Sequence, residues 1–565
     1  MEYISDKIGE QYKEWKQNDR VYITAPTGSG KTQFILKVLL PYAKTQGRTI
    51  LYLVNRKILK AQLLEEVNKY ALEEKLLINI RDYIRIKTYQ ELEENYRNTG
   101  YFMQSNAYYI VCDEAHYFLH DSLFNTVTAI SYAYIENCLL GDKVMIFISA
   151  TIQNFYEKMT DTCEQLLKNA EIKGGEIIQE FEYKMRVKRC LSNSKEHFYS
   201  GEKDYTYLTV IPFDNIEEVE GIILKHKKSE KWLIFLNDIA KGKQLSEVLK
   251  KTDRSAVFIN SRYEEDEEAR KEVYEITTKG NIDHDIVIAT SLLDNGVSIS
   301  DEELRNLIIF ADNEIEFLQM LGRKRQDGAK VLLYLQKKTK KEFSHRLQQV
   351  EKSLEVYQEC DRLLRCNGMG KLFDELLARQ EFYRNARKFL YQSYIFPRAY
   401  PNIMINSLSI DELYNRRNHY EKQVQKFDKE DEYAFFRTQL EWLGFTEEEM
   451  QEAIGRNKET VIEQLSKELS ELLKEYDTKQ MNAKENKDFK LKIRKPLREL
   501  LRKFKSAEEI SKLENLIWRN DVALSADSFN EAMQIVQLPF LMKSYGDGKK
   551  EAMVYIINKL ENEEK

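Results

Sequence analysis

The chain has 565 residues, of which 42% are hydrophobic and 32% are charged. This length is typical of several domains, and the hydrophobic content is enough for buried cores, so the composition excludes a disordered tail. The formal net charge is −6, so any surface for nucleic acid must come from a local arrangement of positive charge. The start lacks a secretory leader, and no apolar stretch approaches the roughly 18 residues that cross a bilayer. We therefore expect a cytoplasmic protein with no membrane partner.

An apolar strand, Val21 to Thr24, runs directly into a glycine-rich loop at positions 25–32. Glycines allow backbone N–H groups to surround phosphates, a lysine reaches the outer oxygens, and a threonine hydroxyl can ligate magnesium. Ala25 stands where the longer phosphate-loop pattern has glycine, so the match is to the shorter form. The sequence predicts an ATP and Mg²⁺ site made by Thr27, Gly28, Ser29, Gly30, Lys31 and Thr32.

A second apolar strand, Tyr108 to Cys112, ends in two adjacent carboxylates, Asp113 and Glu114. Two acids at a strand tip suit magnesium binding and the activation of water. Alone, such a pair could equally be a solvated strand end. Because it follows a phosphate loop, we expect Asp113 to bind the metal with Thr32, and Glu114 to be the catalytic base.

With Ala115 and His116, these two acids spell Asp-Glu-Ala-His, and the chain here resembles the superfamily 2 DEAD/DEAH-box helicases and translocases. The resemblance implies that further residues, in the same order along the chain, serve coupling and nucleic-acid binding. The coupling residues would be His116, Ser149 and Thr151. The residues that contact the nucleic-acid backbone would be Asn55, Arg56, Thr88 and Thr290.

The resemblance continues through a second lobe, marked by strands at 233–237 and 286–291. It implies that Asp294, Gly296 and Gln319 lie near the nucleotide, and that Arg323 stabilises charge on the transferred phosphoryl group. The usual ending places a second arginine at position 326, but this chain has Gln326 and carries Arg325 instead. This Gly-Arg-x-Arg ending resembles that of viral origin-binding helicases and makes Arg325 the candidate second catalytic arginine.

The alternation of strands and helices predicts an α/β fold with two tandem RecA-like parallel-sheet lobes, followed by a largely α-helical C-terminal domain. We expect the first, ATP-binding lobe over residues 1–153 and a connector with short strands near 176–186 over 154–204. The second lobe spans 205–336 and the helical accessory domain 337–565.

Two stretches of the helical domain combine features of nucleic-acid binding. Aromatic and basic residues interleave between Tyr383 and Arg398, which suits base stacking and phosphate contact, although core rings with a solvated rim explain the pattern too. Positive charge is denser between Lys484 and Lys505, where a solvated helix face is the alternative.

Two classes of function fit these features. One is an ATP-dependent helicase or translocase that acts on single-stranded or partly duplex nucleic acid, with DNA favoured by the Gly-Arg-x-Arg ending. The other is an ATP-gated binding or signalling module that does not separate strands and engages a protein partner through the C-terminal helical domain.

Overall fold

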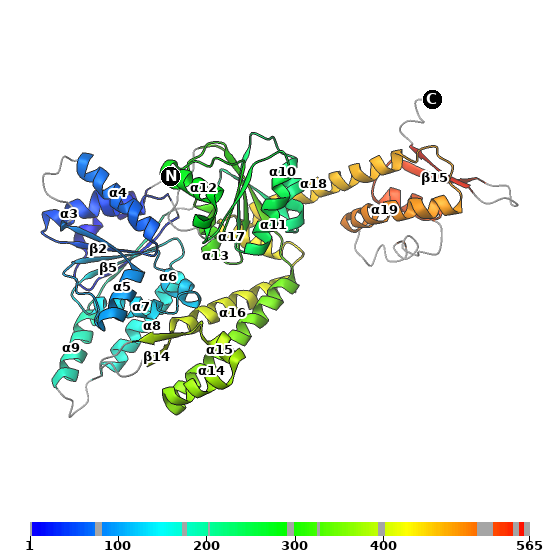
Figure 1. Ribbon diagram of the computed structural model, residues 1–565. Helices are drawn as coiled ribbons and strands as arrows, with labels where there is room; N and C mark the ends of the chain where they lie inside the picture. The colour runs from blue at the N-terminus through cyan, green and yellow to red at the C-terminus, as the bar shows by residue number, and fades with distance from the viewer. Residues whose placement is uncertain are drawn as a thin grey trace. The chain divides into compact units, whose positions relative to one another are not determined.

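The structure is a computed structural model that describes residues 3–26, 28–73, 82–171, 178–201, 204–290, 299–324, 328–393, 402–504, 513, 524–545 and 553–558. The chain divides into two compact units, Met1–Phe445 and Thr446–Lys565. Figure 1 shows the sheets and helices of both. None of the helices in these ranges is both long and apolar enough to cross a membrane.

In the described part of the first lobe, six parallel strands form one sheet in the order β3-β2-β4-β5-β1-β6. The strands are β1 (Arg20–Thr24), β2 (Ile50–Val54), β3 (Ile84–Thr88), β4 (Tyr109–Asp113), β5 (Val144–Ser149) and β6 (Glu196–Ser200). The central strands are buried along their whole length, as expected for a parallel sheet with helices on both faces. Separate hydrophobic cores lie on the two faces.

The helices of this lobe connect successive strands. They are α1 (Ile4–Ile8), η1 (Gln11–Glu14), α2 (Lys31–Phe34), the π-helical η2 (Ile35–Leu39), α3 (Leu40–Thr45), α4 (Lys57–Glu73), α5 (Tyr89–Thr99), α6 (Tyr117–His120), η4 (Asp121–Leu123), α7 (Thr128–Leu139), α8 (Gln153–Asn169) and α9 (Ile178–Ser192). The parallel order places the ends of β1, β4 and β5 side by side. The predicted phosphate loop and acidic pair lie at two of these ends.

The predicted short strands near 176–186 are wrong, because this stretch forms the helix α9. Alternating apolar and charged residues resemble a strand pattern, yet the residues that are buried, Val187, Cys190 and Leu191, have helical spacing. An ion pair between Lys184 and Glu180, four residues apart, also favours the helix. The true strand of this region is β6, which pairs with β1 in the first sheet.

The second lobe repeats the architecture. Within its described residues, six parallel strands have the order β7-β12-β11-β8-β10-β9. They are β7 (Leu208–Phe213), β8 (Lys231–Leu236), β9 (Ala256–Ile259), β10 (Ile286–Ala289), β11 (Leu304–Phe310) and β12 (Val331–Gln336). Its helices are η5 (Ile216–Glu218), α10 (Val219–Leu224), α11 (Ile239–Lys250), η6 (Tyr263–Glu265), α12 (Glu267–Lys279) and α13 (Glu314–Leu321). The two sheets confirm the predicted pair of RecA-like lobes.

The first unit also contains a helical region that contacts both lobes. It comprises α14 (Lys340–Ala378), α15 (Gln380–Ala386), β13 (Leu390–Ser393), β14 (Asn402–Ile405), α16 (Leu408–Phe427) and α17 (Ala434–Trp442). Just before α16, the buried Asn406 side chain donates to Thr128 Oγ1 of the first lobe at 2.9 Å. Towards the other end of the helix, His419 Nε2 donates to the Asp312 carbonyl of the second lobe at 2.8 Å. The helix α16 therefore bridges the two lobes.

The second unit is mainly helical with its own core. Its elements are α18 (Glu447–Lys474), α19 (Ala483–Phe504), α21 (Ala526–Ile535), β15 (Phe540–Tyr545) and β16 (Met553–Asn558). The strands β15 and β16 form an antiparallel pair. Together with α14 to α17, these elements confirm the predicted largely helical C-terminal region.

Candidate active site

The phosphate loop has the backbone conformation that only glycine adopts readily. Gly28 and Gly30 have φ angles of 87° and 83°, in the left-handed region. A Cβ atom on Gly30 would lie 3.0 Å from the Tyr3 ring. Lys31, the first residue of α2, folds over the loop and donates from Nζ to the carbonyls of Ala25 at 2.5 Å and Pro26 at 2.9 Å. The loop thus fits a phosphate group, and Thr27 alone of the predicted loop residues lies outside the described residues.

Asp113 is buried at the end of β4 and is held by a neighbouring strand. The Tyr52 hydroxyl of β2 donates to its Oδ2 at 2.9 Å, and Tyr52 is also a hydrogen-bond partner of Thr32. Burial, and then the charge of Glu114, raise the pKa of Asp113 to about 7, against the opposing effect of Lys31. Thr32 and Asp113 therefore both lie beside the Tyr52 hydroxyl.

Glu114 has two features of a functional rather than structural carboxylate. Its φ angle is 51°, a conformation that costs free energy for a residue with a side chain. Its buried Oε2 has no hydrogen-bond partner. The nearest imidazole nitrogen, His116 Nδ1, is 3.4 Å away but donates to another residue. This carboxylate oxygen is therefore buried with its hydrogen-bonding capacity unused.

His116 joins the two lobes through both of its ring nitrogens. The Gln319 amide of α13 donates to Nε2 at 2.7 Å, so Nε2 carries no proton and Nδ1–H donates to Ser149 Oγ at 2.9 Å. Burial lowers the pKa of His116, which favours this neutral ring. Ser149 Oγ in turn accepts the Thr151 N–H at 3.0 Å. The predicted coupling residues therefore form one chain of hydrogen bonds that reaches the second lobe.

Only some of the residues of the second lobe that are predicted to contact the nucleotide lie within the described residues. Arg323 is 4% exposed, and its Nε donates to the Gln319 carbonyl at 2.9 Å. Arg325, Asp294 and Gly296 lie outside the described residues. Of the predicted catalytic arginines, only Arg323 can therefore be described.

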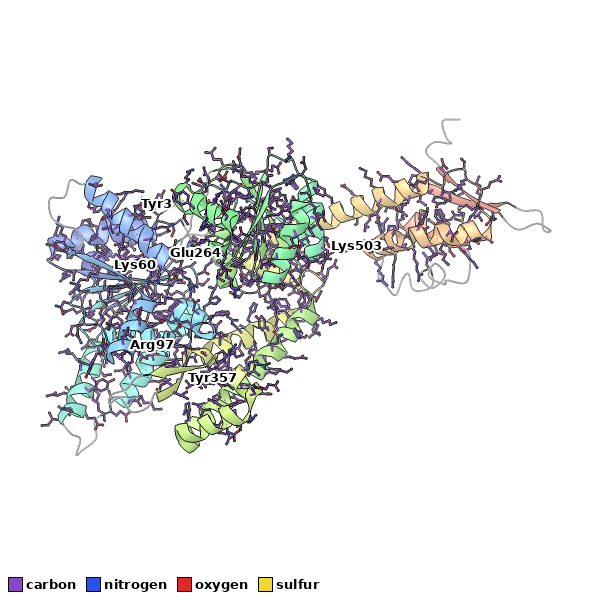
Figure 2. The ribbon with its side chains drawn as sticks, viewed as in Figure 1. Tyr3, Lys60, Arg97, Glu264, Tyr357 and Lys503 are labelled. Carbon is purple, nitrogen blue, oxygen red and sulfur yellow. The ribbon has the colours of Figure 1, made fainter. Side chains whose placement is uncertain are left out.

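A cavity of about 1310 Å³ lies between the lobes of the first unit, beside the His116 to Gln319 hydrogen bond. Arg56 and Thr290, both predicted to bind nucleic acid, line it. Asn55 and Thr88 are buried and do not. The Thr88 hydroxyl caps α5 by accepting the Glu91 N–H at 3.1 Å, the ordinary structural role of such a residue. Figure 2 shows how densely side chains fill the first lobe around Lys60 and Arg97.

Sequence reasoning missed two sets of polar residues. Tyr52 carries no motif, although a tyrosine in a buried strand requires a partner for its hydroxyl. The second set surrounds the buried Glu93, whose carboxylate accepts hydrogen bonds from Tyr117, Asn125 and Ser131. Burial raises the pKa of Glu93 despite these donors. This network fixes α5 against the segment that follows His116.

Comparison with known proteins gives one family match. Residues 2–154 match the family described as "Type III restriction enzyme, res subunit". This region is the first lobe, which is therefore similar to the helicase-type domain of that family. No curated protein matches the chain in sequence.

The solved structures that match this chain include two of low sequence identity. Mss116p bound to ssRNA and AMP-PNP is 14% identical, with a TM-score of 0.39 over 68% of this chain and 85% of that one. The DEAH/RHA helicase HrpB of Escherichia coli is 13% identical, with a TM-score of 0.35 over 56% of this chain and 40% of that one.

Proposed function

We propose that this protein is an ATP-dependent nucleic-acid helicase or translocase that acts on DNA. The observation that carries the proposal is the His116 to Gln319 hydrogen bond. It connects the segment of the carboxylates at the end of β4 to the second lobe, beside a cavity lined by Arg56 and Thr290. A site for ATP and a site for nucleic acid would thus share one contact between the lobes.

In this proposal, the phosphate loop and the acidic pair divide the chemistry of ATP hydrolysis. Lys31 exchanges the Ala25 and Pro26 carbonyls for phosphate oxygens, which offer a full opposite charge. Thr32 and Asp113 would hold Mg²⁺, which when bound neutralises phosphate charge. Glu114 orients the attacking water and accepts its proton through the unpartnered Oε2.

The second lobe completes this site. Arg323 leaves the Gln319 carbonyl and stabilises charge on the transferred phosphoryl group, and Arg325 is assigned the same role. Asp294, Gly296 and Gln319 complete the nucleotide site. Hydrolysis therefore requires the lobes to close.

Closure would convert hydrolysis into movement along the strand. His116, Ser149 and Thr151 carry the change between lobes, while Arg56 and Thr290 hold the phosphate backbone from opposite lobes. Asn55 and Thr88 would act indirectly, by supporting the loops beside the cavity. We retain the domain limits 1–153, 154–204, 205–336 and 337–565 as part of the proposal, with the 154–204 segment contributing β6 to the first sheet.

The test is ATP hydrolysis and strand displacement on labelled duplexes with a 3′ or a 5′ single-stranded overhang, made of DNA or RNA. We expect DNA to stimulate ATP hydrolysis by the wild type, and one of the two overhang polarities to support strand displacement. The Lys31→Ala variant should neither hydrolyse ATP nor displace a strand. Hydrolysis and binding without displacement would instead favour an ATP-gated binding or signalling module. Stronger stimulation by RNA would contradict the assignment to DNA.

A further inference from the structure

A large aromatic side chain, Phe124, stands open in the cleft between the lobes. It is 74% exposed and lines the cavity that Arg56 and Thr290 also line. A phenylalanine ring is stabilised by burial, so this open ring would gain from contact with a flat partner in the cleft. None of the predicted motifs assigns a role to this residue.

The ring is displayed on a backbone that is fixed on both sides. The Phe124 N–H donates to the Asp121 carbonyl at 2.9 Å. On one side, the Ser122 carbonyl accepts the Ser409 hydroxyl of α16 at 3.0 Å. On the other, the Asn125 amide donates to the Tyr117 hydroxyl at 2.7 Å and to buried Glu93 at 3.0 Å. Exposure of Phe124 is therefore not a result of a loose loop, and little ordering entropy would be lost on binding.

A charged group from the helical region is fixed beside the ring. The Arg416 guanidinium carbon lies 5.8 Å from the Phe124 ring centroid. Its Nε donates to Glu412 Oε1 at 2.6 Å, which holds it in place. Because the ring remains mostly exposed next to this cation, a second flat group can still reach it.

The surroundings of Phe124 combine what a single strand of nucleic acid requires. Arg56, Lys57 and Arg97 place positive charge along the cavity wall, beside the carboxylates of Glu93, Glu94, Asp121 and Glu316, and Thr290 supplies a hydroxyl from the other lobe. Proteins that bind single strands independently of sequence generally combine contacts to the phosphates with an aromatic ring on which a base stacks. The helix α6 and η4 connect His116 to Phe124 directly, so the ring is close in sequence to the hydrogen bond between the lobes.

We propose that Phe124 is a stacking platform for an unpaired base of the strand in the cleft. This inference rests on the proposed function, since it needs a nucleic acid in that cavity. Stacking holds one base while the phosphate contacts shift, so it positions the strand without reading its sequence. Phe124 is a binding residue here and takes no part in the hydrolysis of ATP.

The experiment compares Phe124→Ala, Phe124→Leu and Phe124→Trp in the full-length protein. Affinity for a fluorescein-labelled single-stranded DNA is measured by anisotropy with a non-hydrolysable ATP analogue. A second strand carries 2-aminopurine, whose fluorescence is quenched when it stacks, and a third carries a run of abasic sites. The control is Tyr274→Ala, which removes a ring that is 62% exposed on α12 and does not line the cavity.

We expect Phe124→Ala to weaken binding of normal DNA about tenfold and to relieve quenching of 2-aminopurine. The leucine variant should bind similarly weakly, the tryptophan variant should restore both signals, and the Tyr274→Ala control should match wild type. Abasic DNA should bind all Phe124 variants with equal affinity, because no base remains to stack. Thermal unfolding confirms that each variant is folded.

Three results would overturn the inference. If the wild type binds DNA and Phe124→Ala binds it equally well, the platform is wrong while the proposed function stands. An equal loss on normal and abasic strands would likewise show that Phe124 does not stack on a base. If the wild type binds no single strand at all, the proposed function fails and this inference fails with it.

Discussion

The carboxyl edge of the first sheet and the amino edge of the second sheet both carry buried acidic side chains, with opposite outcomes. At the carboxyl edge, Glu114 Oε2 has no hydrogen-bond partner and its backbone is left-handed. The neighbouring Asp113 has its pKa raised to about 7, first by burial and then by the charge of Glu114. Acids are crowded here at a cost in stability.

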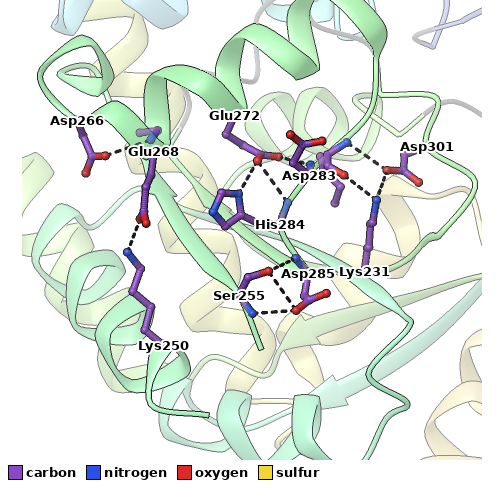
Figure 3. A network of polar contacts seen from close by, with 12 residues as sticks. Lys231, Lys250, Ser255, Asp266, Glu268, Glu272, Asp283, His284, Asp285 and Asp301 are labelled. Atoms are coloured by element: carbon purple, nitrogen blue, oxygen red, sulfur yellow. Dashed lines mark hydrogen bonds and ion pairs between the residues drawn. The ribbon is translucent and has the colours of Figure 1, made fainter. Parts of the chain in front are cut away.

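At the amino edge of the second sheet, each buried acid is matched by donors (Figure 3). Glu272 is 1% exposed, yet it accepts the Asp283 N–H at 2.9 Å and His284 Nδ1 at 2.6 Å. Burial acts to raise the pKa of Asp301, but hydrogen bonds led by that of Lys231, at 3.0 Å, outweigh it and the pKa is lowered.

This difference in hydrogen bonding distinguishes carboxylates that can bind a ligand from carboxylates that stabilise the fold. A carboxylate with all its hydrogen bonds made has no capacity left for a ligand, whereas one that lacks them gains from a metal ion, a water molecule or a substrate. Substitutions at the first edge should therefore change turnover, and substitutions at the second should change stability.

The largest effect is expected for Lys31→Ala. Without the ammonium, the outer phosphates lose their counter-charge, and hydrolysis should fall by roughly a thousandfold or more. Steady-state phosphate release measures this. Lys37→Ala, an exposed lysine on the following π-helical segment, is the matched control and should turn over normally. Phosphate release near the wild-type rate in Lys31→Ala would contradict the site.

Next is Glu114→Gln, which keeps the shape of the side chain but removes the base. We expect turnover to fall about 10²- to 10⁴-fold while binding of ATP persists, so that the closed, nucleic-acid-bound state accumulates. Single-turnover hydrolysis and the binding of a fluorescent ATP analogue separate the two effects. Normal turnover would show that Glu114 is not the base.

A smaller effect is expected for Gln319→Leu, which breaks the hydrogen bond between the lobes. Buried His116 Nε2 would lose its donor, a loss worth about 1–3 kcal/mol, so kcat should fall about tenfold with less change in ATP affinity. The control is Gln336→Leu, because the Gln336 amide bonds only within its own lobe, to the Asp214 carbonyl. A change in KM with unchanged kcat would limit Gln319 to its place in the nucleotide site and remove it from the coupling between the lobes.

The basic face of α19 should contribute less again. Lys484, Lys487, Lys495 and Arg502 are exposed along this helix, while Lys490 is buried, and Figure 2 labels Lys503 near its end. Replacing these four cations with Gln should flatten the log–log salt dependence of single-strand binding by about 0.7 for each phosphate that is no longer neutralised. Four exposed lysines of the second lobe form the control set, namely Lys227, Lys228, Lys251 and Lys271. An unchanged slope of the salt dependence would show that the basic face of α19 is only solvated and does not contact phosphates.

The motifs allow the residues at the strand ends of the first sheet to be predicted from the sequence. Asp113, Glu114 and the phosphate loop lie at the ends of apolar strands, and parallel strands bring such ends to one edge of the sheet. The sequence pattern predicts strands where the structure has the helix α9, because the apolar residues in the first turns of this helix are not buried. Ile178, for example, is 76% exposed.

Hydrogen bonds between distant segments left no signal in the sequence. Asn406 and Ser409 bond to the first lobe from more than 270 residues away, and nothing in local spacing indicates such a partner. The role of Phe124 was hidden for the same reason, since its exposure depends on how α6, η4 and α16 pack. The motifs therefore indicate which residues gather at the strand ends, whereas the cleft beside them depends on how distant segments pack.

The smallest effect is expected at the amino edge of the second sheet, from His284→Gln. The hydrogen bond to Glu272 raises the pKa of His284, so the protonated ring stabilises the folded lobe. This stabilisation is fully present below the ordinary histidine pKa of about 6.5 and is lost as the pH rises through the higher pKa of the folded state. The variant should therefore be less stable than wild type by about 1.5 kcal/mol at pH 6 and should approach it at pH 9. Thermal unfolding midpoints across that range measure the difference, with exposed His345→Gln as the control. A difference in stability that is independent of pH would show that the imidazole contributes by packing alone. A loss of ATP turnover in the folded variant would show that the amino edge of the second sheet also affects catalysis, which would contradict the distinction between the two edges.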